Sequence, residues 1–100
     1  MSYYLVANFD VIDQEMFDQY RPEVGPTLKK YGAKVLVVDH APNDIEKGSR
    51  NTLVILEFES EAVMMRWYNS PEYQAIIKLR TDATEGWMRG APQFEMPSPS

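Results

Sequence analysis

Residues 53–59 read LVILEFE, and this stretch of strand-forming residues decides the fold. Its first four residues are all apolar, which is typical of a strand that is buried on both faces. Ser60 follows as a helix-capping residue, and the apolar residues Val63, Met64 and Trp67 then share one side of a helix. The stretch therefore predicts a strand that leads directly into a helix.

Two more strands and a polar loop precede this stretch. Residues 3–9 (YYLVANF) and residues 33–39 (AKVLVVD) are rich in β-branched, aromatic and other apolar residues, so each predicts a strand. Within the second of them, residues 35–38 are again continuously apolar. Residues 40–51 (HAPNDIEKGSRN) carry the polar, proline and glycine punctuation of a loop.

A helix is predicted between the first two strands. Asp13 is placed to cap it, and apolar residues recur at intervals of three and four through residues 17–31. Proline removes a backbone donor and clashes with the preceding turn. We therefore expect a kink or a break at Pro22 and at the Gly25-Pro26 pair.

The last part of the chain predicts one more helix and one more strand. Ser70 is placed as a helix cap and Pro71 as the first helical residue, with the helix continuing through Arg80. Residues 87–94 (WMRGAPQF) contain a glycine and a proline, so we expect an edge strand or an irregular one there.

The predicted order of elements is β-α-β-β-α-β. This order makes an α+β, ferredoxin-like fold, an antiparallel sheet with helices on one face. We expect a single domain over residues 1–95 and a flexible C-terminal tail at residues 96–100. Because the continuous apolar strands call for burial on both faces, we expect a second copy of the chain to cover the other face in a homodimer.

Composition limits the function classes. The chain has 100 residues, a net charge of −5 and no cysteine. An acidic domain repels phosphate backbones, so no nucleic-acid partner is expected. The absence of cysteine excludes thiolate metal sites and disulfides. The sequence shows no membrane-spanning run and no signal peptide, which predicts a soluble, cytoplasmic protein without a membrane partner.

Several segments resemble a known family, the domain of unknown function 1330, over roughly residues 3–86. The segments that carry the resemblance are Tyr4-Leu5-Val6-Ala7-Asn8, Tyr20, Lys30-Tyr31-Gly32, residues 54–58, Tyr68-Asn69-Ser70-Pro71-Glu72-Tyr73, Leu79-Arg80, Asp82-Ala83 and Gly86. The chain departs from the family at residues 87–92, where the family usually has an apolar strand. The resemblance implies a dimeric α+β barrel, in which two ferredoxin-like sheets pack together.

Two enzyme groups with this barrel provide a comparison. Haem-degrading relatives use an asparagine on the first strand, a tryptophan on the later helix and an axial histidine beyond it. Asn8 and Trp67 match, but residues 76–78 read Ile-Ile-Lys, so haem ligation is not supported. Cofactor-independent monooxygenases need an aromatic pocket with a few polar groups, which this sequence permits. We therefore expect no cofactor and no metal.

Four polar residues are candidates for catalysis. Asn8, Asp10, His40 and Arg80 are expected at one edge of the sheet, because the first two strands and the last helix end there. His40 can act as a general base that Asp10 orients, and Arg80 suits a carboxylate or phosphate. Asn8 can hold a carbonyl or enolate oxygen. In the alternative, structural interpretation, Arg80 pairs with Asp82 or Asp10, Asn8 satisfies backbone groups and His40 is an ordinary loop residue.

Five further residues are candidates for a ligand pocket. Tyr20, Trp67, Tyr68 and Tyr73 lie on the helical faces that are predicted to point inward, where they form either core or the wall of a small-molecule site. Glu57 interrupts an apolar strand, so its carboxylate needs a partner, such as a tyrosine hydroxyl or a group of the second copy.

Two functions remain open at this point. In the first, the chain is a dimeric barrel that binds or transforms a small organic metabolite without a metal, as a monooxygenase or isomerase of this fold would. In the second, it is a non-catalytic dimeric module for binding or regulation.

Overall fold

The sheet of this protein contains four antiparallel strands in the order β2-β3-β1-β4. The structure is a computed structural model, and it describes residues 1–97. Its elements are β1 (Tyr3–Val11), α1 (Gln14–Lys30), β2 (Lys34–Asp39), β3 (Thr52–Phe58), α2 (Glu61–Tyr68), α3 (Pro71–Gln74), α4 (Ile77–Thr81) and β4 (Thr84–Pro92). This order and strand arrangement confirm the predicted ferredoxin-like fold.

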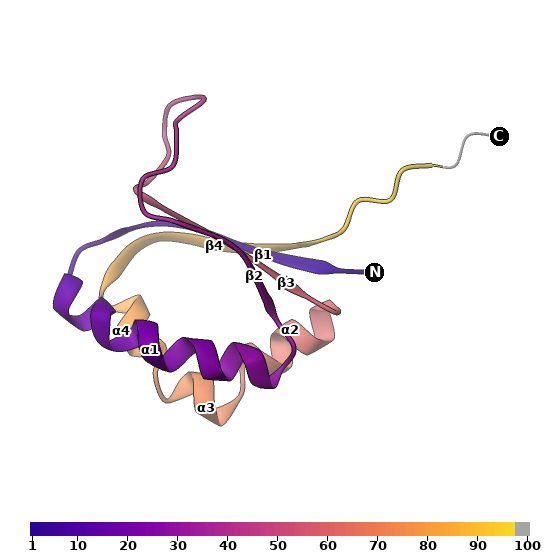
Figure 1. Cartoon of the computed structure of the whole chain (residues 1–100), viewed down its shortest axis with the longest axis horizontal. Helices are drawn as coiled ribbons and strands as arrows, with labels where there is room; N and C mark the ends of the chain where they lie inside the picture. The colour runs from indigo at the N-terminus through magenta and orange to yellow at the C-terminus, as the bar shows by residue number, and fades with distance from the viewer. Residues whose placement is uncertain (98–100) are drawn as a thin grey trace.

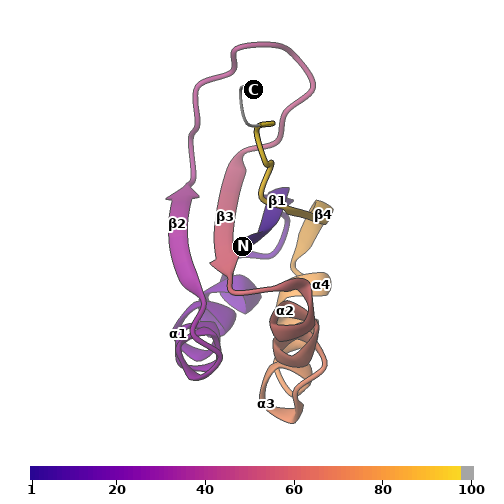
Figure 2. The ribbon, with the colours of Figure 1, turned by 90° about the vertical axis from the view of Figure 1, so that its right-hand side faces the viewer.

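All the helices lie on one side of the sheet (Figure 1). When the molecule is turned, α1 is seen under the β2 side of the sheet and α2 to α4 under the β4 side (Figure 2). The loop 40–51 and the segment 93–97 extend on the opposite side (Figure 1). We call the sheet face that points away from the helices the outer face. No helix in residues 1–97 is both long enough and apolar enough to cross a membrane.

The pleat of β1 decides which residues face the helices. Tyr3, Leu5, Ala7 and Phe9 are buried beneath the helices, so the residues between them lie on the outer face. Leu5 stands opposite Leu56 of β3, which is also buried. The core continues into the helices, where Trp67 and Tyr73 are, with Phe58 of β3, the largest fully buried side chains.

Helix α1 is unbroken, so the predicted break at its prolines is wrong. Pro22 and Pro26 are four residues apart and both are exposed, so the carbonyls that lose a partner face solvent. The buried face formed by Phe17, Tyr20 and Leu28 holds the helix together across them. The predicted cap is confirmed, because Asp13 Oδ1 accepts a hydrogen bond of 3.0 Å from the Met16 backbone N–H.

The second helical region is divided more finely than predicted. The caps at Ser60 and Ser70 are confirmed, but the helix that begins at Pro71 ends at Gln74, and α4 begins at Ile77. The Ile76 N–H bonds back three residues, to the Tyr73 carbonyl, which tightens the chain between the two helices.

Strand β4 is regular, whereas an irregular segment was among the expectations. It pairs with β1 along its whole length, and it is an edge strand, as predicted. Gly90 fits in this strand because the Tyr3 ring lies over it, and a Cβ atom at this position would lie only 2.5 Å from the Tyr3 hydroxyl oxygen. Pro92 is the last residue of the strand, where a missing donor costs little. Of the predicted C-terminal tail, residues 98–100 lie outside the described part of the chain.

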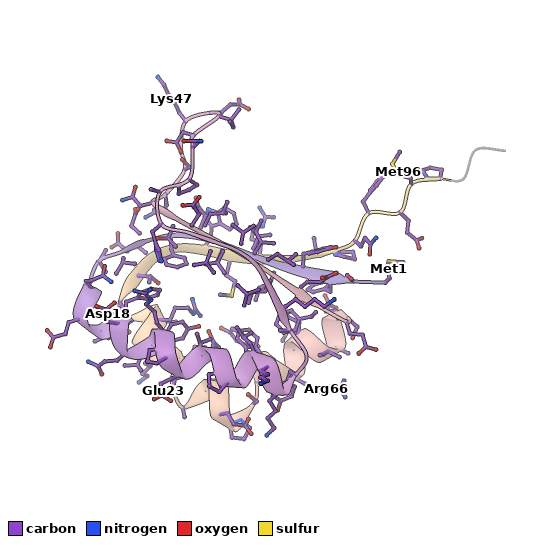
Figure 3. The ribbon with its side chains drawn as sticks, in the orientation of Figure 1. Met1, Asp18, Glu23, Lys47, Arg66 and Met96 are labelled. Atoms are coloured by element: carbon purple, nitrogen blue, oxygen red, sulfur yellow. The ribbon has the colours of Figure 1, made fainter. Side chains whose placement is uncertain are left out.

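The outer face is apolar at its centre, and no helix of residues 1–97 covers it, although the loop 40–51 borders Leu53 and Trp87. Val6, Val37 and Ile55 are paired neighbours on this face and are half-buried. Trp87 lies on the same face and is 47% exposed. The loop 40–51, with Lys47 at its tip, and the segment that carries Met96 flank this face (Figure 3).

Candidate functional site

A cavity of about 290 Å³ lies between the helices and the inner face of the sheet. It is lined by Ala7 and Phe9 of β1, Phe17, Tyr20, Arg21, Val24, Gly25 and Leu28 of α1, Val35 and Val38 of β2, His40, Thr52, Val54 and Leu56 of β3, Trp67 of α2, Arg80 of α4 and Met88 of β4. Most of these side chains are apolar, and a few polar groups stand among them. Small-molecule sites have this composition, and the volume is at the lower end of their range of ~300–1,000 Å³.

The cavity opens between β2 and α1. Val35 and Val38 line it from the edge strand, yet each is 54% exposed, because helix α1 does not close over them. The expectation that the helices bury the inner face of this strand is therefore wrong at Val35 and Val38, and burial of its outer face by a second copy stays a prediction. At the same opening, Arg21 and His40 also line a neighbouring polar recess of about 260 Å³.

His40 lies at this opening rather than deep in the cavity. Its Nδ1 atom is 3.3 Å from the Thr52 hydroxyl, which also lines the cavity. His40 is exposed, so a ligand that enters between β2 and α1 passes its imidazole ring.

The polar end of the cavity is formed by Tyr20, Tyr73 and Arg80, which we call the polar corner. Arg80 Nε donates a hydrogen bond of 3.0 Å to the Tyr73 hydroxyl, and the two tyrosine hydroxyl oxygens are 2.9 Å apart. Among residues 1–97, no carboxylate pairs with Arg80. Burial, together with the neighbouring Tyr73, raises the pKa of Tyr20 well above its ordinary value of 10.0, although Arg80 opposes the shift.

The wall next to the polar corner is apolar because its polar atoms are already bonded. Trp67 is 1% exposed, and its indole N–H donates to the Thr27 hydroxyl at 3.0 Å. The Thr27 hydroxyl in turn donates to the Val24 carbonyl at 2.7 Å. Trp67 therefore presents only its ring to the cavity, and the ring is held against Tyr73 at a centroid distance of 4.1 Å.

The structure brings together four of the residues that the sequence singled out. His40, Arg80, Tyr20 and Trp67 all line the same cavity. Tyr73 lies directly behind them and is fully buried. Tyr68 is not part of the lining, but its ring packs against Trp67 at 6.2 Å and so supports the wall.

Asn8 and Asp10 lie elsewhere, on the outer face. The Asn8 amide donates to the carbonyls of Arg50 and Thr52 and accepts from the Arg50 N–H. Asp10 pairs with the Arg50 guanidinium at 3.0 Å and accepts from the Asn51 N–H. The two side chains anchor the base of the loop 40–51, in line with the structural alternative for Asn8, and Asp10 does not contact His40.

Glu57 also lies on the outer face, away from the cavity. Its carboxylate accepts hydrogen bonds from the Ser2 hydroxyl at 2.5 Å and from the Tyr4 hydroxyl at 3.4 Å. A tyrosine partner for this carboxylate was one of the expected alternatives. The expected partner of Arg80 was Asp82 or Asp10, whereas the structure gives it Tyr73.

Sequence reasoning missed the residues at the opening, namely Arg21, Val35, Val38 and Thr52. A signal for Val35 and Val38 was present in the apolar run of residues 35–38. Because no helix covers this edge strand, burial in the core does not explain why the run is apolar. Arg21 stands four residues after Phe17, at the edge of the buried face of α1, so its place in the helix was the available signal.

Comparisons with known proteins agree with this fold. The model of the family Domain of unknown function (DUF1330) matches residues 2–90 of the chain. A search of the curated proteins found no match.

Three solved structures illustrate the similarity. A protein of unknown function from Rhodopseudomonas palustris has a TM-score of 0.76 at 14% identity, over 95% of this chain and 84% of that one. A dimeric protein of unknown function with a ferredoxin-like fold, from Bacteroides fragilis, has a TM-score of 0.62 at 12% identity, over 92% and 96%. SnoaB, a cofactor-independent oxygenase from Streptomyces nogalater, has a TM-score of 0.60 at 10% identity, over 95% of both chains. At these identities the likeness establishes the shared fold.

Proposed function

The chain belongs to the family known as domain of unknown function 1330, and we propose that it binds a small, largely apolar organic molecule in the cavity between its sheet and its helices. The ligand enters between β2 and α1, passes His40 and lies with its apolar part against Trp67. Its polar end reaches Arg80. His40 and Arg80 are thus proposed as ligand-contacting residues, and Tyr20 and Trp67 as pocket residues.

One observation carries this proposal. The guanidinium of Arg80 lines an apolar cavity and has a tyrosine hydroxyl, not a carboxylate, as its bonded partner within residues 1–97. Arg80 is half-buried, so the guanidinium nitrogens that do not bond Tyr73 are open to the cavity and can donate to an acceptor there. A ligand with a polar end supplies that acceptor, while the apolar walls bind the rest of it.

We also propose that the protein acts as a homodimer through its outer face. Val6, Val37, Ile55 and Trp87 form an apolar surface there that no helix within residues 1–97 covers. The related fold from Bacteroides fragilis is dimeric. In this arrangement the cavity stays on the far side of the sheet and remains open. A cytoplasmic location also stays a prediction.

The proposal is tested by closing the opening of the cavity. Val38→Trp fills the opening between β2 and α1, where the valine is already 54% exposed, so the fold can tolerate the larger ring. Leu36→Trp is the matched control, because Leu36 is 48% exposed on the same strand and does not line the cavity.

The readout is the thermal shift that a panel of carboxylates, phenols and quinones produces. A ligand at a hundred times its Kd stabilises the folded state by about 2.7 kcal/mol and raises Tm by about 11–22 °C for a domain of this size. We expect this shift in the native protein and in Leu36→Trp, and its loss in Val38→Trp. No response from the native protein to any of the panel would favour the alternative, a non-catalytic dimeric module whose cavity has no ligand.

A further inference from the structure

The hydrogen bonds of the polar corner have a fixed direction. A guanidinium donates hydrogen bonds and does not accept them, so the Tyr73 hydroxyl must be the acceptor of the bond from Arg80 Nε. Tyr73 is fully buried, and the Tyr20 hydroxyl, 2.9 Å away, is its other hydrogen-bonding neighbour in the described residues. A buried donor is normally satisfied, so the Tyr73 proton is directed to the Tyr20 oxygen.

The series of hydrogen bonds then runs from Arg80 to Tyr73 to Tyr20, and the Tyr20 proton is the one left without an acceptor among them. Tyr20 lines the cavity, and its oxygen already accepts from Tyr73, so its O–H is left to donate into the cavity. Arg80 lines the same space, and within residues 1–97 its bonded acceptor is the Tyr73 hydroxyl, at Nε. Its guanidinium also lies close enough to Tyr20 to oppose the rise of the Tyr20 pKa. The polar corner therefore presents donors to the cavity and no acceptor.

The charges around the cavity have the same bias. The titratable residues in its lining are Tyr20, Arg21, His40 and Arg80, and among the described residues no aspartate or glutamate belongs to the lining. The chain as a whole carries a net charge of −5. Arg21 already faces the Asp18 carboxylate at 3.5 Å, whereas Arg80 has no carboxylate partner within residues 1–97. The unpaired positive charge of Arg80 therefore favours a ligand with negative charge.

We propose that the polar corner holds an oxygen atom that carries negative charge, so that the ligand is an aromatic or otherwise apolar molecule with a phenolate, enolate or carboxylate oxygen. This inference rests on the proposed function, because it names the ligand class of the same cavity. The oxygen accepts from the Tyr20 hydroxyl and from the terminal nitrogens of Arg80, and the apolar skeleton lies along Trp67 toward the opening.

A consequence for acid–base chemistry follows. When a phenol or enol binds, its O–H bond breaks, the electron pair stays on the oxygen that the corner stabilises, and the proton goes to solvent. Burial keeps the pKa of Tyr20 high, so Tyr20 stays a neutral donor while the ligand ionises. The corner thus lowers the pKa of a bound phenol.

Three probes of one shape test the preference by calorimetry: naphthalene-2-carboxylate, naphthalene-2-carboxamide and 2-naphthylmethylammonium. Hydrogen bonds to a charged group favour the carboxylate over the neutral amide by about ten- to a hundredfold. We expect the ammonium probe to bind more weakly than the amide, since the corner offers it no acceptor. A fourth probe, 2-naphthol, should titrate at least about one pH unit lower when bound than when free, which its absorbance reports.

The variants separate the corner from the cavity. Tyr20→Phe removes only a hydroxyl and should reduce the carboxylate preference about tenfold, while Arg80→Met should abolish it. Tyr31→Phe and Arg66→Gln are the matched controls, because neither residue lines the cavity. Both controls should keep the full preference and the full shift of the naphthol titration.

The outcomes are distinguishable. If the carboxylate and the amide bind the native protein equally, or if the preference survives in both Tyr20→Phe and Arg80→Met, the inference about the oxyanion is overturned while the proposed function stands. If none of the four probes binds the native protein, the proposed function fails and the inference fails with it.

Discussion

A glycine-to-alanine substitution should have different effects at two positions of this fold. At Gly90, in β4, the new Cβ atom would lie 2.5 Å from the Tyr3 hydroxyl oxygen and 2.7 Å from its ring carbon Cε2. Ordinary contacts begin near 3.4 Å, so the Tyr3 ring would have to move by about 1 Å. At Gly25, in α1, nothing beyond the chain neighbours and the adjacent helix backbone lies within 4 Å of the new atom, and the following residue is Pro26.

The magnitudes follow from these surroundings. Overpacking of a buried ring costs about 1–3 kcal/mol, and each kcal/mol corresponds to about 4–8 °C in Tm for a domain of this size. Gly90→Ala should therefore lower Tm by at least about 4 °C. Gly25→Ala should leave Tm nearly unchanged, because the helical preference for alanine, up to about 1 kcal/mol, is opposed by the contact of its Cβ with the ring of Pro26.

Thermal and urea unfolding of both variants test this pair. Tyr3→Leu combined with Gly90→Ala supplies the control, since the alanine should cost less than about 0.5 kcal/mol once the ring is gone. If Gly90→Ala is as stable as the native protein, Tyr3 does not lie across Gly90, and the pairing of β4 with β1 described above is wrong.

Three more predictions concern the dimer, an ion pair and the core. Ile55→Lys on the outer face should weaken the dimer by about a hundredfold, as measured by sedimentation, because it buries an unpaired ammonium group in the interface. Glu23→Lys, on the exposed side of α1, is the control and should leave the dimer intact. The hydrogen bond from Lys30 lowers the pKa of Glu72 below its ordinary 4.5, so the stability that Glu72→Gln removes should be present at neutral pH and vanish as the pH falls through that lowered pKa. Convergence of the two Tm curves in acid checks this, and a constant gap contradicts it. Trp67→Phe should cost about 1–3 kcal/mol in urea unfolding, because the Thr27 hydroxyl loses the hydrogen bond that it accepts and the core loses ring volume. A neutral result would mean that the indole N–H is not bonded.

The element order was predictable because its signals are local. The caps at Asp13, Ser60 and Ser70 and the apolar runs of the strands depend on neighbouring residues alone, and all were confirmed. The break in α1 was not confirmed, because the packing of the buried face of the helix outweighs the tendency of proline to interrupt a helix. Pro22 and Pro26 fall on the solvent side, where missing hydrogen bonds are tolerated.

The grouping of the candidate site residues was harder to predict. His40 and Arg80 come to one cavity through topology, as expected. Asn8 and Asp10 do not reach the cavity, because side chains alternate along β1. Ala7 and Phe9 point to the inner face, so Asn8 and Asp10 point to the outer face. The direction of the hydrogen bonds from Arg80 needs the side-chain positions, which no pattern in the sequence provides.

A crystal structure of the protein with naphthalene-2-carboxylate tests the central claim most directly. We predict that the rings lie between the sheet and α1 against Trp67, with the carboxylate within hydrogen-bond distance of the Arg80 guanidinium and the Tyr20 hydroxyl. A cavity closed by the protein's own side chains, or a ligand found only on the outer face, would contradict the account.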